Sequence, residues 1–212
     1  MKRYGIVAAA ALVALVGCAQ MRSMTGMGGW QTLVDGEKGL ENFNPIGDAN
    51  WHPEGGAIVA DKGKAGFLVT KNSYGNFELR AEFYAETDTN SGVFIRCANA
   101  QKIGADSCYE VNIWDIRPEP KYGTGAIVDV AAVAVPIANK AGGRWNTYEI
   151  IANGSQLTVK LNGVQTASAQ DGKHASGPFA LQMGPGVKGV QGGAIKWRKV
   201  EIRPLEATKA GY

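Results

Sequence analysis

The sequence contains few of the residues on which much enzyme chemistry depends. Its 212 residues include three cysteines and only two histidines, His52 and His174. Two histidines leave few ways to build a serine–histidine triad or a zinc site with histidine ligands. His52 stands beside Trp51 and could line a pocket, but a lone loop histidine is more often a bystander. Any chemistry has to come mainly from other side chains.

Net charge is also small. The formal net charge is +3, and Lys2 and Arg3 supply two of these positive charges at the very start of the chain. No cluster of lysine and arginine elsewhere offers an electrostatic basis for binding nucleic acid. We therefore predict no nucleic-acid partner.

The apolar run near the start of the chain is short. Residues 6–16 form eleven apolar residues after a basic start, too few to span a bilayer but suited to a signal peptide. The run ends in Leu15-Val16-Gly17-Cys18, which resembles the bacterial lipobox, whose cysteine is lipidated and becomes the new N-terminus. The alternative is an ordinary secretory signal with an accidental cysteine. Ala19, in place of Asp, resembles the sorting pattern of outer-membrane lipoproteins.

The rest of the chain has the pattern of an all-β protein. It contains 29 glycines, and about a dozen short apolar or alternating runs are separated by turn signals. Residues 77–83 alternate apolar and polar side chains, and Asn162-Gly163 is a strong hairpin signal. No solid helical pattern is present. We predict a jelly-roll β-sandwich of two antiparallel sheets.

These patterns predict the organisation of the chain. Residues 1–18 are a lipoprotein signal peptide, 19–28 a flexible tether, 29–206 a single jelly-roll domain and 207–212 a tail. Lipidation of Cys18 would attach the protein to a membrane. The predicted location is the bacterial cell envelope, at the outer membrane facing the periplasm.

Two strands in the middle of the chain carry the polar residues of most interest. Residues 90–96 and 109–115 are rich in β-branched and aromatic residues and flank a loop, as neighbouring antiparallel strands do. Alternation places Glu110, Asn112 and Trp114 on one face of the second strand. When the apolar faces of the two strands are matched, Arg96 falls on the same side as Glu110. This combination suits a polar ligand.

The remaining cysteines bracket the loop of this hairpin. Without Cys18, Cys97 and Cys108 are an even pair in an exported chain, and we predict a disulfide. It would stabilise the fold by roughly 3 kcal/mol. Alternation places Cys97 on the apolar face but Cys108 on the face of Glu110, so the pairing requires a bulge or another departure from strand geometry. A Cys–Cys metal site is the alternative, but other ligands at suitable spacing are lacking.

Two further patterns are weaker than they look. Gly184–Gly189 matches G-x-G-x-x-G, but another strand follows in place of a helix, so we predict a loop and no dinucleotide cofactor. Glu110 and Asp115 would lie roughly 16 Å apart on opposite faces of one strand, whereas glycosidase pairs need roughly 5–9.5 Å. Either Asp115 folds back in the following loop, or the reaction is a different one.

A set of short motifs in order resembles the 3-keto-disaccharide hydrolase family, also described as 3-keto-glucoside lyase and hydratase domains. The resemblance covers about residues 29–205. The motifs are Gly29-Trp30 with Leu33-Val34-Asp35-Gly36, Asn90 to Arg96, Tyr109 to Asp115, Thr124 to Ile127, Trp145 to Glu149, Leu161-Asn162-Gly163, Gly177-Pro178 with Leu181-Gln182, and Ile202 to Leu205. The resemblance implies a concanavalin-like fold and activity on 3-keto sugars.

The implied reaction needs one carboxylate, because a 3-keto group acidifies the C2 proton and the glycosidic oxygen at C1 can then leave by elimination. The expected site lies on the concave sheet, with Glu110 as base or metal-holding carboxylate, Arg96 as clamp for the enolate or substrate, and Trp114 stacked on the sugar. The hydroxyl-binding residues would be Asn90, Asn112, Asp115 and Gln182. A divalent metal cation could replace or assist the arginine.

Alternatives remain open at this point. Arg96 and Glu110 could form a cross-strand salt bridge on a solvated sheet. Many relatives have a histidine and a glycine shortly after the Leu-Gln pair, whereas here Met183 and Gly184 follow Gln182. The chain could therefore be a non-catalytic glycan-binding lipoprotein. In either case the expected partner is a carbohydrate.

Overall fold

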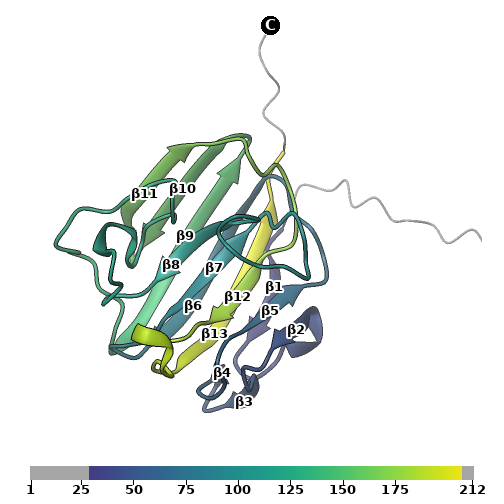
Figure 1. The fold of residues 1–212 in the computed structure, drawn as a ribbon. Coiled ribbons are helices and arrows are strands. Elements are labelled where there is room, and N and C mark those ends of the chain that lie inside the picture. Colours follow the sequence, from purple (N-terminus) through teal and green to yellow (C-terminus); the bar gives the residue numbers. More distant parts are fainter. Residues whose placement is uncertain (1–28, 207–212) are drawn as a thin grey trace, which may run out of the picture.

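The computed structural model describes residues 29–206, and these form a sandwich of two antiparallel sheets (Figure 1). Thirteen strands and three single-turn 3₁₀ helices occur in this part of the chain. The 3₁₀ helices are η1 (Leu40–Asn42), η2 (Pro120–Tyr122) and η3 (Val187–Gly189). The predicted all-β jelly-roll sandwich is confirmed.

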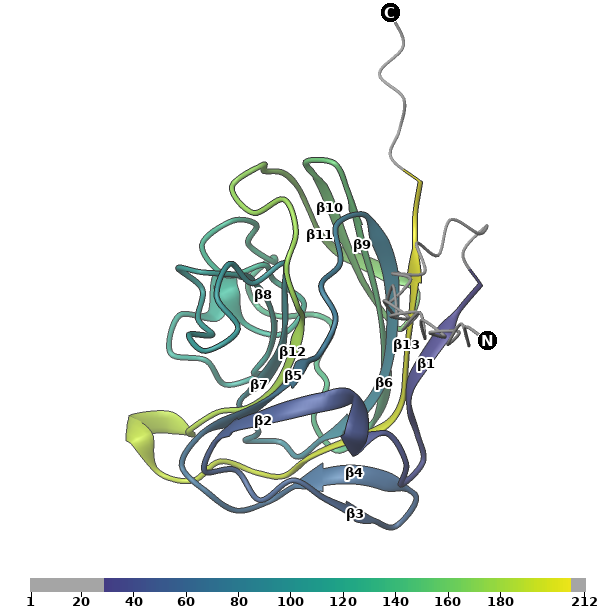
Figure 2. The same ribbon diagram turned by 90° about the vertical axis from the view of Figure 1, so that its right-hand side faces the viewer.

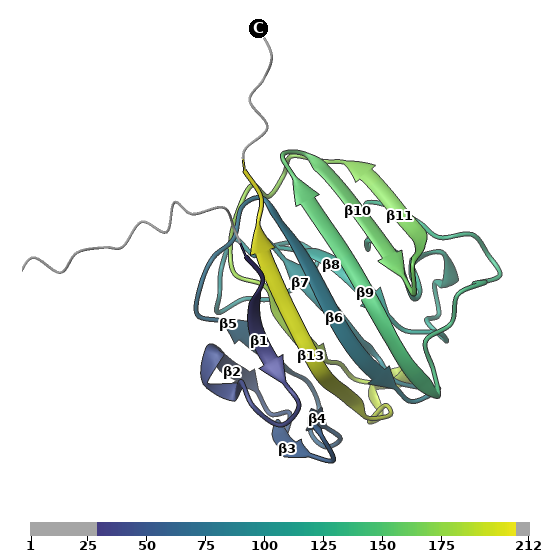
Figure 3. The same cartoon turned by 180° about the vertical axis from the view of Figure 1, so that it is seen from behind.

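One sheet has eight strands in the order β11-β10-β9-β6-β13-β4-β3, and β1 also pairs with β13. Figure 3 shows this sheet in front, with the long strands β6, β9 and β13 side by side. Its strands are β1 (Gln31–Asp35), β3 (His52–Glu54), β4 (Ala57–Ala60), β6 (Phe77–Ala85), β9 (Arg144–Asn153), β10 (Gln156–Leu161), β11 (Val164–Gln170) and β13 (Ile195–Pro204).

The second sheet has five strands in the order β2-β5-β12-β7-β8. They are β2 (Phe43–Gly47), β5 (Gly66–Thr70), β7 (Ser91–Ile95), β8 (Tyr109–Ile113) and β12 (Ala180–Met183). Strand β12 lies between β5 and β7, so segments far apart in sequence become neighbours. Figure 2 shows the two sheets edge-on, with the loops after β7 and β8 gathered on the outer side of the smaller sheet.

The core lies between the sheets and follows from strand alternation. In β6 the apolar residues Phe77, Leu79, Ala81 and Phe83 are fully buried, as their spacing predicts. Aromatic side chains join the sheets at the centre, where Phe83 lies 5.0 Å from Tyr148 between ring centroids. Burial of these large apolar side chains is the main favourable contribution to folding.

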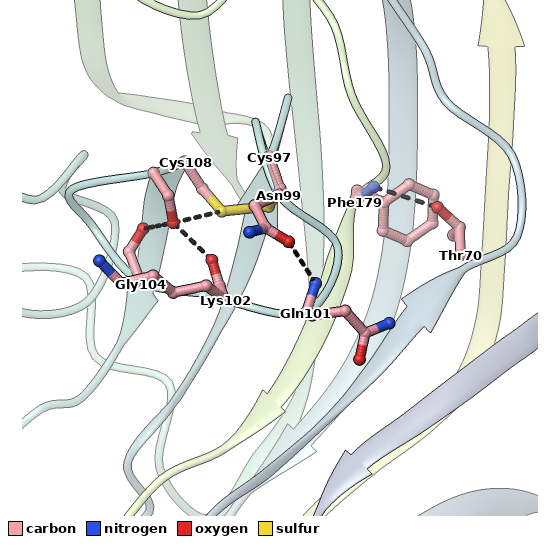
Figure 4. The surroundings of a disulfide bond; sticks show 9 residues. Thr70, Cys97, Asn99, Gln101, Lys102, Gly104, Cys108 and Phe179 are labelled. Atoms are coloured by element: carbon pink, nitrogen blue, oxygen red, sulfur yellow. Dashed lines mark hydrogen bonds between the residues drawn. A yellow bond between two sulfur atoms is a disulfide. The ribbon is translucent and has the colours of Figure 1, made fainter.

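The predicted disulfide between Cys97 and Cys108 is confirmed, with a Cα–Cα distance of 4.2 Å (Figure 4). Both cysteines pack in a small apolar cluster with Phe94, Val69 and Ala180. These residues alternate with the core residues of their strands, so the cluster lies on the outer face of the five-stranded sheet.

The predicted departure from strand geometry occurs at Arg96. Its backbone has a φ of 52°, in the left-handed region that side chains other than glycine rarely adopt. This turn breaks the alternation of β7. Cys97 therefore turns to the outer face, where it reaches Cys108, and Arg96 turns inward.

The prediction that Arg96 lies beside Glu110 is wrong for this reason. The Arg96 side chain is 1% exposed, and its guanidinium donates to the carbonyl oxygens of Gly75 (2.8 Å), Gly154 (2.7 Å) and His174 (3.3 Å). It joins segments of the sandwich that are far apart in sequence. A guanidinium held in this way is structural and is not available to a ligand on the outer face.

The predicted signal peptide, the tether, the lipidation site at Cys18 and the tail from residue 207 lie outside the described residues. Within residues 29–206, the structure has no helix with the length and apolar character needed to cross a bilayer.

We expect Arg96→Lys to lower the free energy of unfolding by roughly 2–4 kcal/mol, measured by urea denaturation. Lysine keeps the charge but cannot reach several buried carbonyl oxygens at once, and each unsatisfied acceptor costs free energy. Arg80→Lys is the matched control, because Arg80 is exposed and stacks over Trp30; its change should stay below about 1 kcal/mol. Equal losses in the two variants would contradict the structural role of Arg96.

Candidate functional site

Glu110 lies on the outer face of the five-stranded sheet. In β8, Tyr109, Val111 and Ile113 face the core, as predicted, which leaves Glu110 and Asn112 on the other side. Glu110 pairs directly with Phe94 of the outer cluster. It is 9% exposed, and no hydrogen bond or ion pair to its carboxylate occurs among residues 29–206. A buried carboxylate without a partner is unusual in a folded protein and calls for an explanation.

The loop between β8 and β9, residues 114–143, covers part of this face, and we call it the covering loop. Its residues 125–128 run beside β8, where the Val128 amide donates to the Glu110 carbonyl oxygen (2.9 Å). Tyr148 of the opposite sheet supports the same strand by donating from its hydroxyl to the Asn112 carbonyl oxygen (2.5 Å). The position of Glu110 is therefore fixed by both sheets and by the covering loop.

Burial raises the pKa of Glu110 from 4.5 to about 7. Two charges of the covering loop act on it in opposite directions: the Arg117 guanidinium lowers the pKa, and the Asp129 carboxylate raises it. Near neutral pH the protonated and ionised forms are therefore present in similar amounts. This is the condition under which a carboxylate serves best as a general base or acid.

Several buried polar atoms without partners come from β8, β12 and the covering loop. Among the described residues, eight buried side-chain nitrogen or oxygen atoms have no hydrogen-bond partner, and four of them belong to these three segments. The four are Asn112 Oδ1, Trp114 Nε1, Arg117 Nε and Gln182 Oε1. Two are acceptors and two are donors, and each has almost no accessible surface in this structure.

Gly92 lies between two of these residues. It pairs with Asn112 across β7 and β8, and on its other side the register of β12 brings Gln182 opposite it. A Cβ atom on Gly92 would lie 3.1 Å from the Val111 carbonyl oxygen and 3.6 Å from both Gln182 Oε1 and Glu110 Cγ. The absence of a side chain at Gly92 therefore lets Glu110 and Gln182 lie close together.

Asp115 and Asn90 are engaged in holding loops. The Asp115 carboxylate accepts from the Thr124 hydroxyl (2.6 Å) and from the backbone amides of Ala141 (3.0 Å) and Gly142 (2.8 Å). It folds back into the covering loop and ties the two ends of that loop together. The Asn90 side-chain amide donates to the Pro185 carbonyl oxygen (2.6 Å), in the loop after β12. Neither residue is joined to Glu110.

Sequence reasoning missed Arg117 and Asp129. Both come from the irregular covering loop, where strand periodicity gives no guide to side-chain direction. The one available signal was proximity in sequence, since Arg117 follows Trp114 by three residues. Arg117 stacks over the Trp114 ring, with its guanidinium carbon 5.7 Å from a ring centroid. The arginine whose charge lowers the pKa of Glu110 is therefore Arg117, whereas Arg96 is held inside the sandwich.

Residues 29–206 contain no group of three or more histidine, cysteine, aspartate or glutamate side chains arranged to hold a metal ion. We derive no step through a metal.

Two hollows on the surface lie elsewhere. One, of about 430 Å³, is lined by Leu40, Trp51 and other residues without titratable side chains. The other, of about 310 Å³, contains Glu86 and Asp61, but Glu86 accepts from the Ala194 amide and Asp61 from the Asn50 side chain. Neither hollow offers an unpartnered buried carboxylate. The candidate site is therefore the Glu110 region.

Comparison with known proteins points to carbohydrate chemistry. The family model of the 3-keto-alpha-glucoside-1,2-lyase-like domain matches residues 29–203. No match to the chain was found among curated protein sequences.

Solved structures share the sandwich. A protein of Parabacteroides distasonis ATCC 8503 assigned as a glycosyl hydrolase is 25% identical, with a TM-score of 0.65 over 84% of this chain and 100% of its own. A second such protein from this organism is 17% identical, with a TM-score of 0.66 over 84% and 95%. Lectin I-B4 of Griffonia simplicifolia is 15% identical, with a TM-score of 0.58 over 83% and 99%. The last two likenesses show the fold alone.

We expect Glu110→Gln to stabilise the fold at pH 8 by up to about 3 kcal/mol, because a change of one in pKa corresponds to about 1.4 kcal/mol. The folded-state pKa is raised, so the stability contribution of Glu110 is fully present below pH 4.5 and is lost as the pH rises through 7. At pH 4 the substitution should therefore change little. Urea denaturation at the two pH values measures the difference.

Glu119→Gln is the matched control, since Glu119 is exposed on the covering loop and paired with Lys121. Its effect should be small at both pH values. An effect of Glu110→Gln that is the same at pH 4 and pH 8 would show that Glu110 titrates normally.

Proposed function

Because the chain belongs to the family of 3-keto-alpha-glucoside-1,2-lyase-like domains, we propose that it cleaves the glycosidic bond of 3-keto-glycosides with Glu110 as the base. The observation that carries this proposal is the buried carboxyl of Glu110, unpartnered among the described residues and with a pKa of about 7. A carboxylate of this kind lowers the stability of the folded state when it is ionised, and its pKa is suited to removing a weakly acidic proton.

The proposed reaction is an elimination. Glu110 removes the C2 proton, and the electron pair of the C2–H bond forms a C2–C3 double bond while the C3 ketone becomes an enolate. The ketone then re-forms, a C1–C2 double bond appears, and the C1–oxygen bond breaks. The leaving oxygen takes up the proton, giving an unsaturated keto sugar and an alcohol. Addition of water across the C1–C2 double bond would complete a net hydrolysis.

One carboxylate is sufficient for this route. Ordinary retaining and inverting glycosidases need two carboxylates at opposite sides of the bond. Here Glu110 is alone on its strand face, and Asp115 is held by backbone amides of the covering loop. The presence of a single free carboxylate at the site therefore favours elimination over the two-carboxylate mechanism.

The unpartnered atoms around Glu110 supply the proposed sugar contacts. Asn112 Oδ1 and Gln182 Oε1 would accept hydrogen bonds from hydroxyl groups, and Trp114 Nε1 would donate one.

A non-catalytic role is the second candidate. It is favoured by Gly184, which stands at the position where many relatives have a histidine, two residues after the Leu-Gln pair. If that histidine is required for turnover, this domain would bind a glycan without cleaving it. Sugar affinity without product would identify this function.

We expect the purified chain to release an alcohol and an unsaturated keto sugar from a 3-keto-disaccharide, with a rate that rises through about pH 7 as Glu110 ionises. Glu110→Gln should reduce kcat by roughly 10²–10⁴-fold, the usual contribution of a general base. Glu119→Gln should leave kcat unchanged. Absence of turnover both with and without added divalent metal would dismiss the proposed activity.

We further propose that Cys18 carries a lipid anchor in the cell envelope. The support is the lipobox-like sequence that ends at this residue. In a bacterial host, the chain should incorporate a labelled fatty acid and fractionate with the outer membrane, and Cys18→Ser should lose the label and become soluble. An unlabelled wild-type chain would support an ordinary secretory signal.

A further inference from the structure

We propose that strand β11, together with the neighbouring residues 132–138 of the covering loop, is an interface at which two copies of this chain associate. This face does not include Glu110, and association there is independent of the proposed function.

The other outer strands of the two sheets are protected against pairing with a further strand. Strands β2 and β3 each contain a proline, Pro45 and Pro53, which cannot donate a backbone hydrogen bond. Strand β8 is bonded to residues 125–128 of the covering loop, and the Leu33 carbonyl oxygen of β1 accepts from the Asn42 side chain (2.8 Å). Such protection is usual, because a free edge offers a row of unpaired backbone groups to any other strand.

Strand β11 (Val164–Gln170) lacks this protection. It is the outermost strand of the eight-stranded sheet, is seven residues long and contains neither proline nor a charged residue (Figure 3). Among residues 29–206 its backbone pairs only with β10. The register shifts at Thr166, whose hydroxyl donates to the Gly125 carbonyl oxygen (2.8 Å) of the covering loop. Beyond this bulge, residues 167–170 keep a regular register and a free edge.

An exposed apolar run of the covering loop lies beside β11. Residues 132–138 read Ala-Val-Ala-Val-Pro-Ile-Ala, and within them Val135 is 57% exposed. Val164, at the start of β11, is 50% exposed, so two of the four exposed large apolar side chains of the described residues belong to this face. The run is held in place, because the Val133 amide donates to the Lys121 carbonyl oxygen (2.8 Å).

The shape of this face favours a protein surface over a small ligand or a membrane. The hollow between the run and β11, which Ile137 and Gln165 help to line, has a volume of about 130 Å³, below the roughly 300 Å³ at which small-molecule sites begin. Acyl chains of a membrane could cover the apolar run, but they offer no hydrogen bonds to the free edge of β11. A strand of another protein chain supplies those hydrogen bonds, and its apolar side chains cover the run.

A second copy of the chain fits this face by symmetry and by charge. Antiparallel strands exchange the same donors and acceptors, so an edge that is free on one copy is complementary to the same edge of another copy across a twofold axis. Residues 130–139 and 161–170 contain no charged residue, whereas 19% of the chain is charged and its net charge is +3. Two copies therefore meet here without bringing like charges together, and depletion of charge is typical of the centre of an interface. The protected edges elsewhere stop the assembly at a dimer.

The test measures the dimer dissociation constant by analytical ultracentrifugation. Every chain carries Cys18→Ser, so that neither a lipid anchor nor a free thiol contributes to association. Ser168 is exposed within the free edge. Ser168→Lys and Ser168→Glu should each raise the dissociation constant by at least about tenfold, because each brings two like charges together across the twofold axis. An equimolar mixture of the two variants should associate at least as tightly as the chain with Ser168, since the charges are then opposite. A loss caused by misfolding would not be rescued by mixing.

Val135→Asp should also weaken the dimer, because a charge then faces the apolar surface of the other copy. Val190→Asp is the matched control, since Val190 is the most exposed large apolar side chain of the described residues (63%) and follows η3, outside this face; it should leave the dissociation constant unchanged. Hydrogen exchange of the amides in residues 167–170 should slow as the protein concentration rises.

A chain that stays monomeric up to its solubility limit would overturn the proposal. A dimer that Ser168→Lys and Val135→Asp both leave unchanged would overturn it too, because the interface would then lie elsewhere. Binding of a monomeric chain to phosphatidylglycerol vesicles, abolished by Val135→Asp, would replace the second copy by a membrane as the occupant of this face.

Discussion

The left-handed backbone at Arg96 is the constraint on which the rest of this end of the molecule depends. One residue with a φ of 52° sends its own side chain into the sandwich and the next side chain out of it. Inside, the guanidinium joins the carbonyl oxygens of Gly75 and Gly154, which belong to segments far apart in sequence. Outside, Cys97 reaches Cys108 and closes the loop between β7 and β8. Gly92 lies in β7 and Glu110 lies in β8. The same break therefore helps to fix the positions of the two strands that form the candidate site.

The candidate site lowers the stability of the folded state. A carboxyl that is 9% exposed and lacks a hydrogen-bond partner within residues 29–206 destabilises the folded state whenever it is ionised. Buried polar atoms without partners gather in the same region. Proteins keep such groups mainly where a ligand will satisfy them or where the strain is used in a reaction. The cost thus supports a functional interpretation of the region over a purely structural one.

The covering loop sets the surroundings of the outer face of β8. Segment 125–128 of this loop pairs with the backbone of β8, and burial raises the pKa of Glu110 in that strand. The same loop brings Arg117 and Asp129 close enough to act on that carboxyl. A bare sheet face could bind a sugar by stacking and hydrogen bonds, but it could not hold a carboxyl half-ionised at neutral pH. The loop therefore supports a proton-transfer role for this member of the family.

The sequence by itself determined the strands, the core face of β8, the outward direction of Glu110 and the need for an irregularity next to the cysteines, because strand alternation depends only on neighbours along the chain. It placed Arg96 wrongly because that same irregularity reverses the alternation at the residue where it occurs. Only the tertiary structure decided which cation acts on Glu110, and that Asp115 and Asn90 hold loops. Arg117 lies in an irregular segment whose path is set by contacts such as that of Asp115 with Gly142, 27 residues further on. Contacts of this length have no local signature, since they exist only after the chain has folded.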